Sequence, residues 1–532
     1  MKHKQFNKKL LISIFTVLLV TVFSITSLAC TNILVGKEAS TDGSVFTSHT
    51  VDGRYDSRIR VIPAQDHEEG AMLKIYRGKD FKKAERPEVE PEVVGEIPQV
   101  DHTYKYFESC YSLANEHQLF TAETTQGGAR ETKNSSEAIM SIRMLSRIAL
   151  QRAKTAREAI KIMGDLAVRY GFAETAYLGE CLSVADPNEV WMFEVYGAGP
   201  IWERDSDIPG AAWAAKRVPD NHVSINPNYS RFRKLDPNDE DTMVSEGYIE
   251  LAEHLEIYDP EEDGEFIWNE IYGNVSPGND RMWRLYSLLK PSKDWDYNKT
   301  HEYPFSIEPD EKLSVEDVIA LFRDVNIGSE LDITDNEAWF YENDDGEKVK
   351  SPIATPQARY KLPYLSQLLG IDHVRHTGIA ACSSYWVGQA RDWLPDPIGG
   401  VLWYGINSPE NGPFMPLYVG ADEVPESYSV LNRDEFDEDS AWWAFAKVDD
   451  YVNRRYQKLK PKLDKELLNP MQNYWFDMQE PVENKALNIY ENEGEEAVRA
   501  FLTQYSNAQM EWAEQSYWEF ADKLFFDLSR GY

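Results

Sequence analysis

The alternation of apolar and polar positions predicts a β-hairpin early in the chain. Residues 31–37 and 44–52 are rich in β-branched and apolar side chains, which are typical of strands. The turn dipeptide Asp42-Gly43 separates them, so the two strands are expected to pair in antiparallel fashion. Further strands are expected at residues 104–114, 119–124 and 223–227.

Helical spacing dominates two other parts of the chain. Residues 136–170 repeat apolar positions every three to four residues, and Thr155 and Glu158 are spaced as a capping box. Three amphipathic helices rich in Trp and Tyr are expected at 442–459, 463–480 and 495–528, and Pro470 is expected to kink or split the middle one. The pattern by itself predicts a protein of mixed α and β structure.

An uncharged stretch at residues 10–29 precedes the first predicted strand. Four lysines lie before it, and small residues occupy the third and first positions before Cys30. These are the three parts of a secretory signal. We therefore expect export, with cleavage that makes Cys30 the first residue of the mature chain.

Two alternatives for this stretch stay open. Twenty uncharged residues could span a bilayer as an uncleaved anchor, although Thr and Ser interrupt the run and no basic cluster follows it. A lipoprotein signal would instead lead to acylation of Cys30. Such signals usually place Leu three residues before the Cys, whereas Leu28 is two residues before it, and the strand-like sequence after Cys30 is unlike a flexible tether.

Composition narrows the range of partners. The chain has 90 acidic and 55 basic residues and a formal net charge of −35. Proteins bind nucleic acids and anionic membranes through Lys and Arg side chains, so neither is expected as a partner of this acidic chain. With 42% hydrophobic residues, 532 residues can bury a large core and form more than one domain. A homo-oligomer is left open.

The cysteines do not suggest a disulfide scaffold. There are four, which are Cys30, Cys110, Cys181 and Cys382. This number is too small for a disulfide-rich fold, although one disulfide among the last three is an open alternative in an oxidising compartment.

A terminal cysteine would carry both a nucleophile and a base. Its α-amine, with a pKa of about 7.7 to 8.0, can accept the thiol proton near neutral pH. A hairpin centred near Thr41 pairs residues whose numbers sum to about 82, which places Asp52 opposite Cys30, where its carboxylate could orient the amine. The alternative is that Asp52 merely ends the strand in a turn. Side chains alternate between the two faces of a strand, and His49 is three residues from Asp52. We therefore expect His49 on the face opposite Asp52 and Cys30, in a structural role.

Several segments match a known pattern in order and spacing. The sequence Ala-Cys-Thr-Asn-Ile-Leu-Val-Gly-Lys at 29–37 precedes Asp-Gly-Ser at 42–44, Asn-Glu-His-Gln-Leu at 115–119 and Ala-Asp-Pro at 185–187. Trp-Ala-Ala-Lys-Arg-Val-Pro-Asp follows at 213–220, Gln-Ala-Arg-Asp at 389–392 and Gly-Gly-Val-Leu-Trp-Tyr at 399–404. Together they resemble the secernin-like cysteine dipeptidases of the N-terminal nucleophile (Ntn) hydrolase superfamily, whose members include conjugated bile salt hydrolase and penicillin V acylase.

The resemblance implies roles for individual residues. Cys30 would be the nucleophile and Asp52 would orient its amine. Asn115 would donate its amide to the oxyanion, where such a donor typically lowers the barrier by roughly 3 to 4 kcal/mol. Asn228 would contribute to the active site. Both asparagines also suit plain turns, which is the structural alternative.

The chain departs from the family pattern at one position. Relatives tend to have Arg-Asn-x-Asp at the end of the second strand, whereas this chain has His-Thr-Val-Asp at 49–52. The arginine that could bind a substrate carboxylate is therefore missing. Arg54, Arg58 or Arg281 could replace it, and we place Arg281 among the expected site residues.

The resemblance also implies a fold. We expect an α+β protein with the four-layer αββα sandwich of the Ntn hydrolases. It would consist of a signal peptide at 1–29, a catalytic domain at 30–438 and a C-terminal helical region at 439–532 packed on the core.

We therefore expect a secreted or envelope-associated cysteine dipeptidase that acts on small peptides through a thioester on Cys30. The sequence lacks His-Glu-x-x-His, Cys-x-x-Cys, a phosphate-binding glycine loop and Gly-x-Ser-x-Gly, so no metal or cofactor is expected. No integral membrane span is expected after processing. The alternatives are an acylase for penicillin V or bile salts and a non-catalytic lipoprotein acylated at Cys30.

Overall fold

A computed structural model describes residues 30–53, 55–77, 92–174, 178–274, 278–430 and 435–530. The expected signal segment at 1–29 and Arg54 lie outside these residues. In the described part of the chain, no helix combines the length and the apolar character that crossing a bilayer requires.

The first of two large sheets holds the beginning of the described chain. Its seven strands follow the order β16-β14-β1-β2-β19-β20-β21, and all neighbours are antiparallel. The strands are β1 (Asn32–Val35), β2 (Val45–Asp52), β14 (Val223–Asn226), β16 (Ser306–Ile307), β19 (Cys382–Ala390), β20 (Val401–Ile406) and β21 (Met415–Tyr418). The predicted hairpin forms, and it occupies the centre of this sheet.

The register of the hairpin differs from the prediction by one residue. Val35 pairs with Phe46, and Thr31 bridges to Thr50, so paired numbers sum to 81 instead of 82. A shift of one residue exchanges the two faces of a strand. The face of Cys30 is therefore shared by His49 and not by Asp52, whose strand partner is Cys382 on β19.

The second sheet has eight strands in the order β15-β13-β12-β11-β10-β9-β8-β3. They are β3 (Arg60–Ile62), β8 (Tyr106–Glu108), β9 (Ser112–Asn115), β10 (Phe120–Gln126), β11 (Gly179–Ala185), β12 (Val190–Gly197), β13 (Ala211–Arg217) and β15 (Thr242–Val244). Strands predicted at 104–114 and 119–124 correspond to β8 to β10. The single strand expected at 104–114 is instead a hairpin, because β8 and β9 pair with each other in antiparallel fashion.

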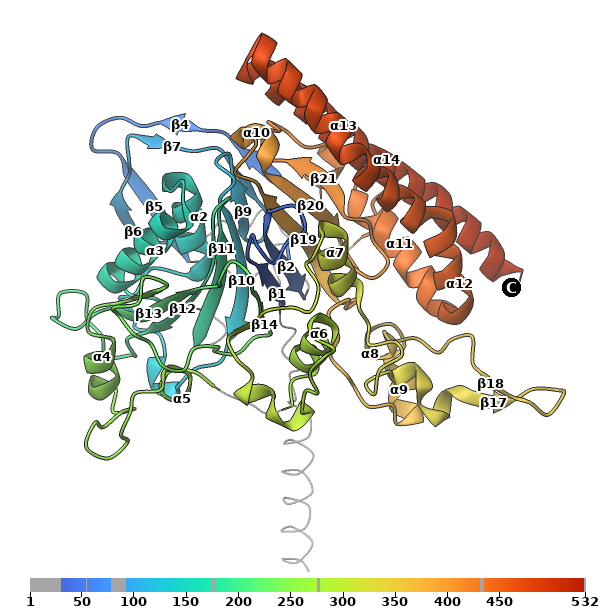
Figure 1. Ribbon diagram of the computed structural model, residues 1–532, viewed down its shortest axis with the longest axis horizontal. Coiled ribbons are helices and arrows are strands. Elements are labelled where there is room, and N and C mark those ends of the chain that lie inside the picture. The colour runs from blue at the N-terminus through green and yellow to red at the C-terminus, as the bar shows by residue number, and fades with distance from the viewer. Residues whose placement is uncertain are drawn as a thin grey trace, which may run out of the picture.

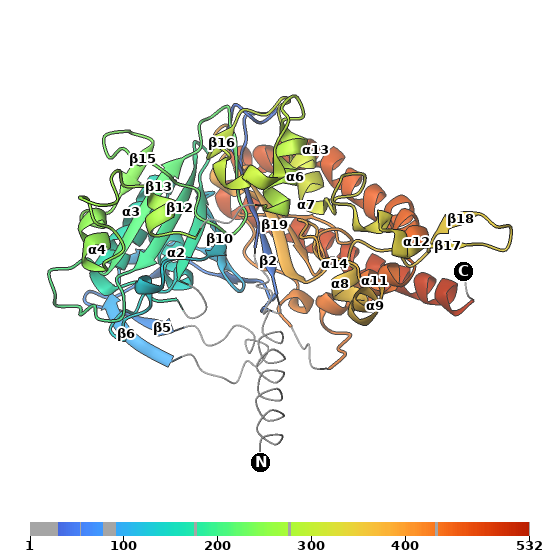
Figure 2. The ribbon, with the colours of Figure 1, turned by 90° about the horizontal axis from the view of Figure 1, so that it is seen from below.

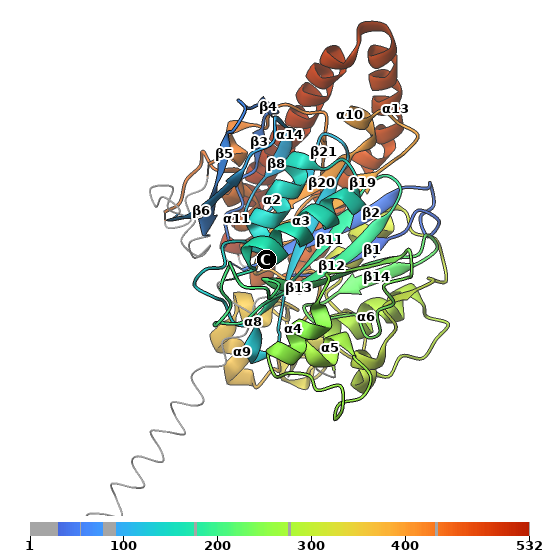
Figure 3. The ribbon, with the colours of Figure 1, turned by 90° about the vertical axis from the view of Figure 1, so that its left-hand side faces the viewer.

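The two sheets pack against each other, and helices cover their outer faces (Figures 1 and 3). Strand β2 of the first sheet contacts β10, β11 and β12 of the second. Helices α2 (Ile142–Arg152) and α3 (Ala156–Tyr170) lie on the second sheet, whereas α7 (Val315–Arg323), α13 (Asn469–Glu493) and α14 (Glu495–Ser529) contact strands of the first. The interface between the sheets is where the candidate site lies.

The long helical pattern at 136–170 forms two helices instead of one. Ser141 caps α2 by accepting a hydrogen bond from the Met144 amide, and Thr155 caps α3 by accepting one from the Glu158 amide. Glu158 reaches back to the amide of Lys154, one residue before the position that a standard capping box uses. Thr155 therefore begins a new helix inside the predicted one.

The C-terminal helices follow the predicted pattern closely. They are α11 (Ala441–Arg454), α12 (Tyr456–Leu463), α13 (Asn469–Glu493) and α14 (Glu495–Ser529). A π-helical turn at Asp464–Leu468 separates α12 from α13, and Pro470 lies in the first turn of α13, as a splitting proline should. In Figure 2, α13 and α14 run beside the first sheet, on the side away from α3.

The remaining elements are short. The strands are β4 (Gln65–Asp66), β5 (Met72–Arg77), β6 (Glu92–Pro98), β7 (His102–Thr103), β17 (Phe340–Glu342) and β18 (Lys348–Lys350). The helices are α4 (Tyr248–His254), α5 (Trp268–Ile271), α6 (Asp280–Leu289), α8 (Ala358–Lys361), α9 (Pro363–Leu369) and α10 (Asp396–Gly399). The mixture of helices and sheets agrees with an α+β protein. The assignment to the Ntn sandwich and the domain boundary at 438 stay predictions.

Candidate active site

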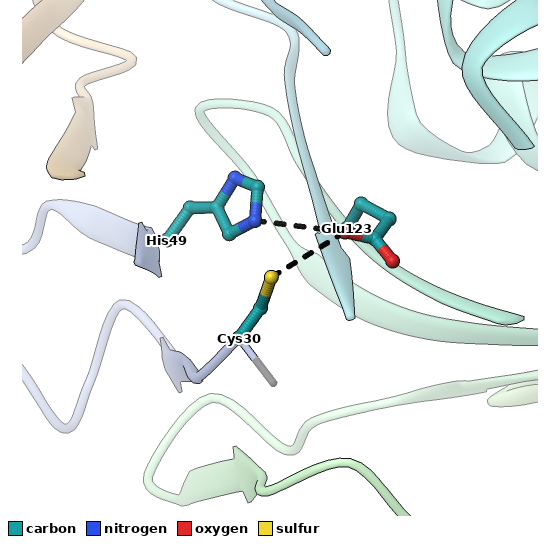
Figure 4. A group of neighbouring side chains, drawn as sticks. All are labelled: Cys30, His49 and Glu123. Atoms are coloured by element: carbon teal, nitrogen blue, oxygen red, sulfur yellow. Dashed lines mark hydrogen bonds and ion pairs between the residues drawn. The ribbon is translucent and has the colours of Figure 1, made fainter. Parts of the chain in front are cut away.

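Cys30 lies at the start of β1, buried between the two sheets. Only 4% of its surface is exposed. Its Sγ donates a hydrogen bond to Oε2 of Glu123 on β10, over 3.6 Å, so the thiol bridges the two sheets (Figure 4). The strand-like sequence after Cys30 determines this position, because the central strand β1 begins only two residues after it.

Arg281 joins Cys30 to Asn228. In α6, Nη1 of Arg281 donates to the carbonyl of Cys30 at 2.6 Å and to Thr31 Oγ1 at 2.7 Å. Its Nη2 donates to the carbonyl of Pro227 and to Oδ1 of Asn228, both at 2.8 Å. Burial and the nearby Arg375 lower the pKa of Arg281 to about 9, so the guanidinium is still a cation at neutral pH.

Asn228 holds a backbone conformation that suits this contact. Its φ of 73° lies in the left-handed region, which asparagine tolerates better than most residues. Its amide group donates to the carbonyl of Thr125 at 2.7 Å, so Asn228 links the β14 end to β10. The structure thus brings together three of the predicted site residues, Cys30, Asn228 and Arg281, through hydrogen bonds.

Asp52 is fully buried beside this group. Arg375 donates a charged hydrogen bond to its Oδ2. The other oxygen, Oδ1, accepts no hydrogen bond from the described residues. Burial raises the pKa of Asp52, while the charges of Arg375 and Arg281 oppose that rise. A carboxylate with one unused oxygen is a natural acceptor for a cation.

His49 corrects a prediction from strand parity. Because the register differs by one residue, its ring lies on the Cys30 side, and Nε2 is 3.9 Å from Oε2 of Glu123 (Figure 4). Burial lowers the pKa of His49 to about 3, so the imidazole is neutral over the usual working range. His49 is therefore a member of the site and not a residue of the opposite face.

Two buried glutamates face the thiol from the second sheet. Glu123 and Glu180 hydrogen bond to each other, and Oε1 of Glu123 also accepts from Thr125 Oγ1 at 2.7 Å. Burial raises the pKa of both, and that of Glu180 lies well above its usual range because the Glu123 carboxylate is adjacent. The pair therefore tends to share one proton.

These surroundings keep Cys30 in the thiol form. Burial raises its pKa well above the usual value, and the negative charges of Glu123 and Asp52 add to that rise; a hydrogen bond from the Asp52 main chain opposes it. A buried thiol is a poor nucleophile until a base removes its proton. Chemistry at Cys30 therefore requires a base close to Sγ.

The structure corrects the role predicted for Asn115. Both hydrogens of its side-chain amide are used, in bonds to the carbonyls of Leu150 at 2.9 Å and Ala153 at 2.8 Å. Its Oδ1 accepts from the amides of His117 and Leu119. Asn115 holds the β9–β10 turn against the end of α2, so its amide is not available to an oxyanion.

Arg58 does not reach this site as a substitute for the missing arginine, because it is paired with Asp56 at 2.6 Å. The sequence did not predict Arg375 as a site residue, because it lies in a loop segment and no local pattern marks it. Glu123 was also missed, although a glutamate inside a strand as apolar as 119–124 is an unusual feature that could have marked it.

The cysteines and possible metal ligands complete the site. All four cysteines are buried, and none of them forms a disulfide within the described residues. Among the described residues, Cys30, His49 and Glu123 form a group whose ligand atoms are close enough together to hold a metal ion.

Comparisons with known proteins relate the chain to peptidases. Residues 29–468 match peptidase family C69. A probable dipeptidase of Latilactobacillus sakei is 23% identical over 455 residues, covering 81% of this chain and 82% of the relative. A probable dipeptidase B of Streptococcus pyogenes serotype M1 is 25% identical over 470 residues, with 84% and 83% covered. A probable dipeptidase of Salmonella dublin is 23% identical, with 74% and 81% covered.

Proposed function

The chain belongs to peptidase family C69 and is a peptidase, and from this premise we propose that it is a secreted dipeptidase whose nucleophile is Cys30. The relatives named as dipeptidases match over most of their length, which supports a small peptide substrate. The observation that carries the proposal is the position of the Cys30 thiol. It is buried at the start of a central strand, with its carbonyl held by Arg281 and its side chain among ionisable groups.

The base in this proposal is the α-amine of Cys30 itself. Removal of residues 1–29 would free that amine beside the thiol, where its ordinary pKa of about 7.7 to 8.0 suits proton transfer. Asp52 supports this assignment because its Oδ1 lacks a partner among the described residues and can accept from an ammonium group. The amine would take the Sγ proton, and the sulfur would attack the scissile carbonyl carbon.

The rest of the cycle follows from this first step. The α-ammonium returns the proton to the leaving amine as the peptide C–N bond breaks, which leaves a thioester on Cys30. Water then attacks the thioester, with the α-amine as base again, and releases the acid. The Arg281 cation beside the Cys30 carbonyl fixes the main chain of the nucleophile and favours negative charge nearby.

The thiol is tested by substitution. We expect Cys30→Ala to reduce hydrolysis of a dipeptide panel by at least about a thousandfold while far-UV circular dichroism stays unchanged. Cys181→Ala is the matched control, because Cys181 is an equally buried cysteine in β11, and it should retain turnover. Unchanged dipeptide hydrolysis by Cys30→Ala would refute the proposal. Turnover of penicillin V or bile salts without dipeptide turnover would assign the acylase alternative.

The amine and the export step are tested by intact-mass analysis of the protein secreted by its producing cells. We expect a chain that starts at Cys30 and carries no modification there. A different first residue, or a lipid on Cys30, would contradict the mechanism, because acylation consumes the groups that the reaction needs.

A further inference from the structure

Three different metal-ligating atoms meet at the candidate site. They are Sγ of Cys30, Nε2 of His49 and Oε2 of Glu123, and all lie within 4.8 Å of one another. Each comes from a different part of the fold, since Cys30 precedes β1, His49 belongs to β2 and Glu123 to β10. Figure 4 shows the three side chains pointing toward a common point.

The spacing of these atoms agrees with tetrahedral zinc. Zinc binds sulfur at about 2.3 Å and nitrogen or oxygen at about 2.0 to 2.2 Å, so ligand atoms on a tetrahedral edge are about 3.4 to 3.6 Å apart. The observed separations are 3.6 Å between Sγ and Oε2 and 3.9 Å between Nε2 and Oε2. Sγ and Nε2 lie within 4.8 Å of each other, and the Nε2–Oε2 separation is about half an ångström longer than a tetrahedral edge, so His49 must move closer to the other two ligands to complete the geometry.

The ligands are also free to bind. His49 is 1% exposed, yet its Nε2 has no hydrogen-bond partner among the described residues, although a buried nitrogen usually has one. When the neutral ring carries its proton on Nδ1, Nε2 can offer a lone pair to a metal ion. Oε1 of Glu123 is held by Thr125, which leaves Oε2 as the oxygen facing the group. An arginine at position 49, as in the family pattern, would offer no such lone pair.

We propose that Cys30, His49 and Glu123 form a binding site for Zn²⁺ that blocks the thiol reversibly. Binding replaces the Cys30 S–H bond with a sulfur–zinc bond, and the displaced proton goes to solvent. Glu123 gives up its hydrogen bond from the thiol and becomes a ligand, and the fourth position keeps a water. One sulfur, one nitrogen and one oxygen favour zinc over Mg²⁺ or Ca²⁺, which prefer oxygen ligands. The site goes beyond the proposed peptidase reaction and does not depend on turnover.

The test measures metal binding directly. The purified protein is titrated with Zn²⁺ by calorimetry and with Co²⁺ by absorption, where a thiolate-to-cobalt charge-transfer band reports the sulfur ligand. We expect one ion per chain and a cobalt band that iodoacetamide treatment of Cys30 abolishes. His49→Gln and Glu123→Gln should each weaken Zn²⁺ binding at least about tenfold. His222→Gln removes a half-exposed histidine that hydrogen bonds to Ser306, and it should leave the affinity unchanged.

Two results would overturn the proposal. One is the absence of a thiolate–cobalt band from the wild-type protein. The other is Zn²⁺ binding that His49→Gln and Glu123→Gln leave unaltered, because the ion would then occupy a surface site. If either variant loses its native circular dichroism, the proposal is tested instead by alkylating Cys30 in the folded wild type. Zn²⁺ affinity that survives alkylation contradicts the proposed site.

Discussion

Arg281 contacts the main chain of Cys30, the nucleophile in the proposed reaction. Its two terminal nitrogens donate to the carbonyls of Cys30 and Pro227 and to side chains of Thr31 and Asn228. The planar guanidinium group of arginine binds all of these partners at fixed positions, and the single ammonium group of a lysine cannot replace it. The sequence predicts Arg281 as a possible substitute for the missing arginine, and these contacts lead us to propose that it positions the main chain of Cys30.

We predict that Arg281→Lys lowers kcat by about a hundredfold with little change in KM, because a small displacement of the nucleophile is costly. The measurement is steady-state hydrolysis of the dipeptide that gives the highest wild-type rate. Arg284→Lys is the control, since Arg284 lies in the same helix and pairs with Asp324 away from Cys30. A rise in KM at constant kcat would instead indicate direct substrate binding.

His376 gives a prediction about acid stability. It is buried, its Nε2 lies 3.2 Å from the Pro356 carbonyl, and the charged groups facing it are Arg375 and His373. Burial and Arg375 lower its pKa from 6.5 to about 3. Only the unfolded chain therefore takes up this proton as the pH falls below about 6.5, so the histidine destabilises the folded state progressively down to about pH 3.

We predict that the wild type loses about 2.5 kcal/mol more unfolding free energy between pH 7 and pH 4.5 than His376→Gln does. Urea denaturation at the two pH values measures the difference. The other histidines with a lowered pKa, which are His49, His222 and His373, are present in both proteins, so their contributions cancel. Equal pH dependence in both proteins would show that His376 is already charged in the fold.

Sequence reasoning found the residues that have a local signal and missed those that depend on tertiary contact. Cys30 was predicted from the segment before it, and Asn228 from the family resemblance of the segment that contains it. Arg375 reaches Asp52 from 323 positions away, so nothing near it in the sequence announces the contact. His49 was placed on the wrong face because parity depends on a register that the turn sequence alone does not fix.

At the scale of elements, the β9–β10 turn is anchored to α2 by one side chain. Asn115 accepts from two amides of the turn and donates to two carbonyls at the end of the helix. We predict that Asn115→Ala destabilises the protein by about 2 to 3 kcal/mol, because buried backbone groups lose their partners. It should leave kcat nearly unchanged at a temperature where the variant is folded.

This pair of measurements separates the two roles considered for Asn115. Loss of an oxyanion donor would lower kcat by about a hundredfold to a thousandfold, even in a stable variant. Thermal unfolding and kcat are therefore measured on the same preparation. A large fall in kcat would restore the role that the sequence resemblance implied.

The sequence predicted the type of most elements better than their ends. Strands at 31–37 and 44–52 and three late helices were expected and are present, because their periodicity is long and regular. The helix expected at 136–170 is two helices, since the Thr155 cap acts against the continuous apolar pattern. The order of strands in each sheet could not be deduced, because it depends on contacts between segments far apart in sequence.

For the whole molecule, the late helices share one core with the first sheet. Phe414, just before β21, exchanges two hydrogen bonds with the side chain of Gln472 in α13. Leu502 of α14 is fully buried in the same apolar cluster as Ile33 and Val35 of β1. The helical region therefore completes the core around the candidate site and does not merely follow it.

We predict that a chain ending at residue 438 does not fold, because it exposes the apolar surface that α11 to α14 cover. Heating the full protein should give a single cooperative transition by both circular dichroism and tryptophan fluorescence. Leu502→Ala should keep that single transition while lowering stability by about 2 to 4 kcal/mol. Two separate transitions, or a soluble active product ending at 438, would show that the regions fold independently.

The eight residues of β2 are all buried, and the strand is paired on both sides, with β1 and β19. Chain ends ordinarily fray and exchange their amide hydrogens with solvent fastest. In the mature protein proposed above, the N-terminus would instead be held against β2, the strand whose amide hydrogens are expected to exchange most slowly. Amide hydrogens beside Cys30 should exchange for deuterium only when the whole molecule unfolds. The reactive N-terminus would therefore lose its structure together with the fold and not before it.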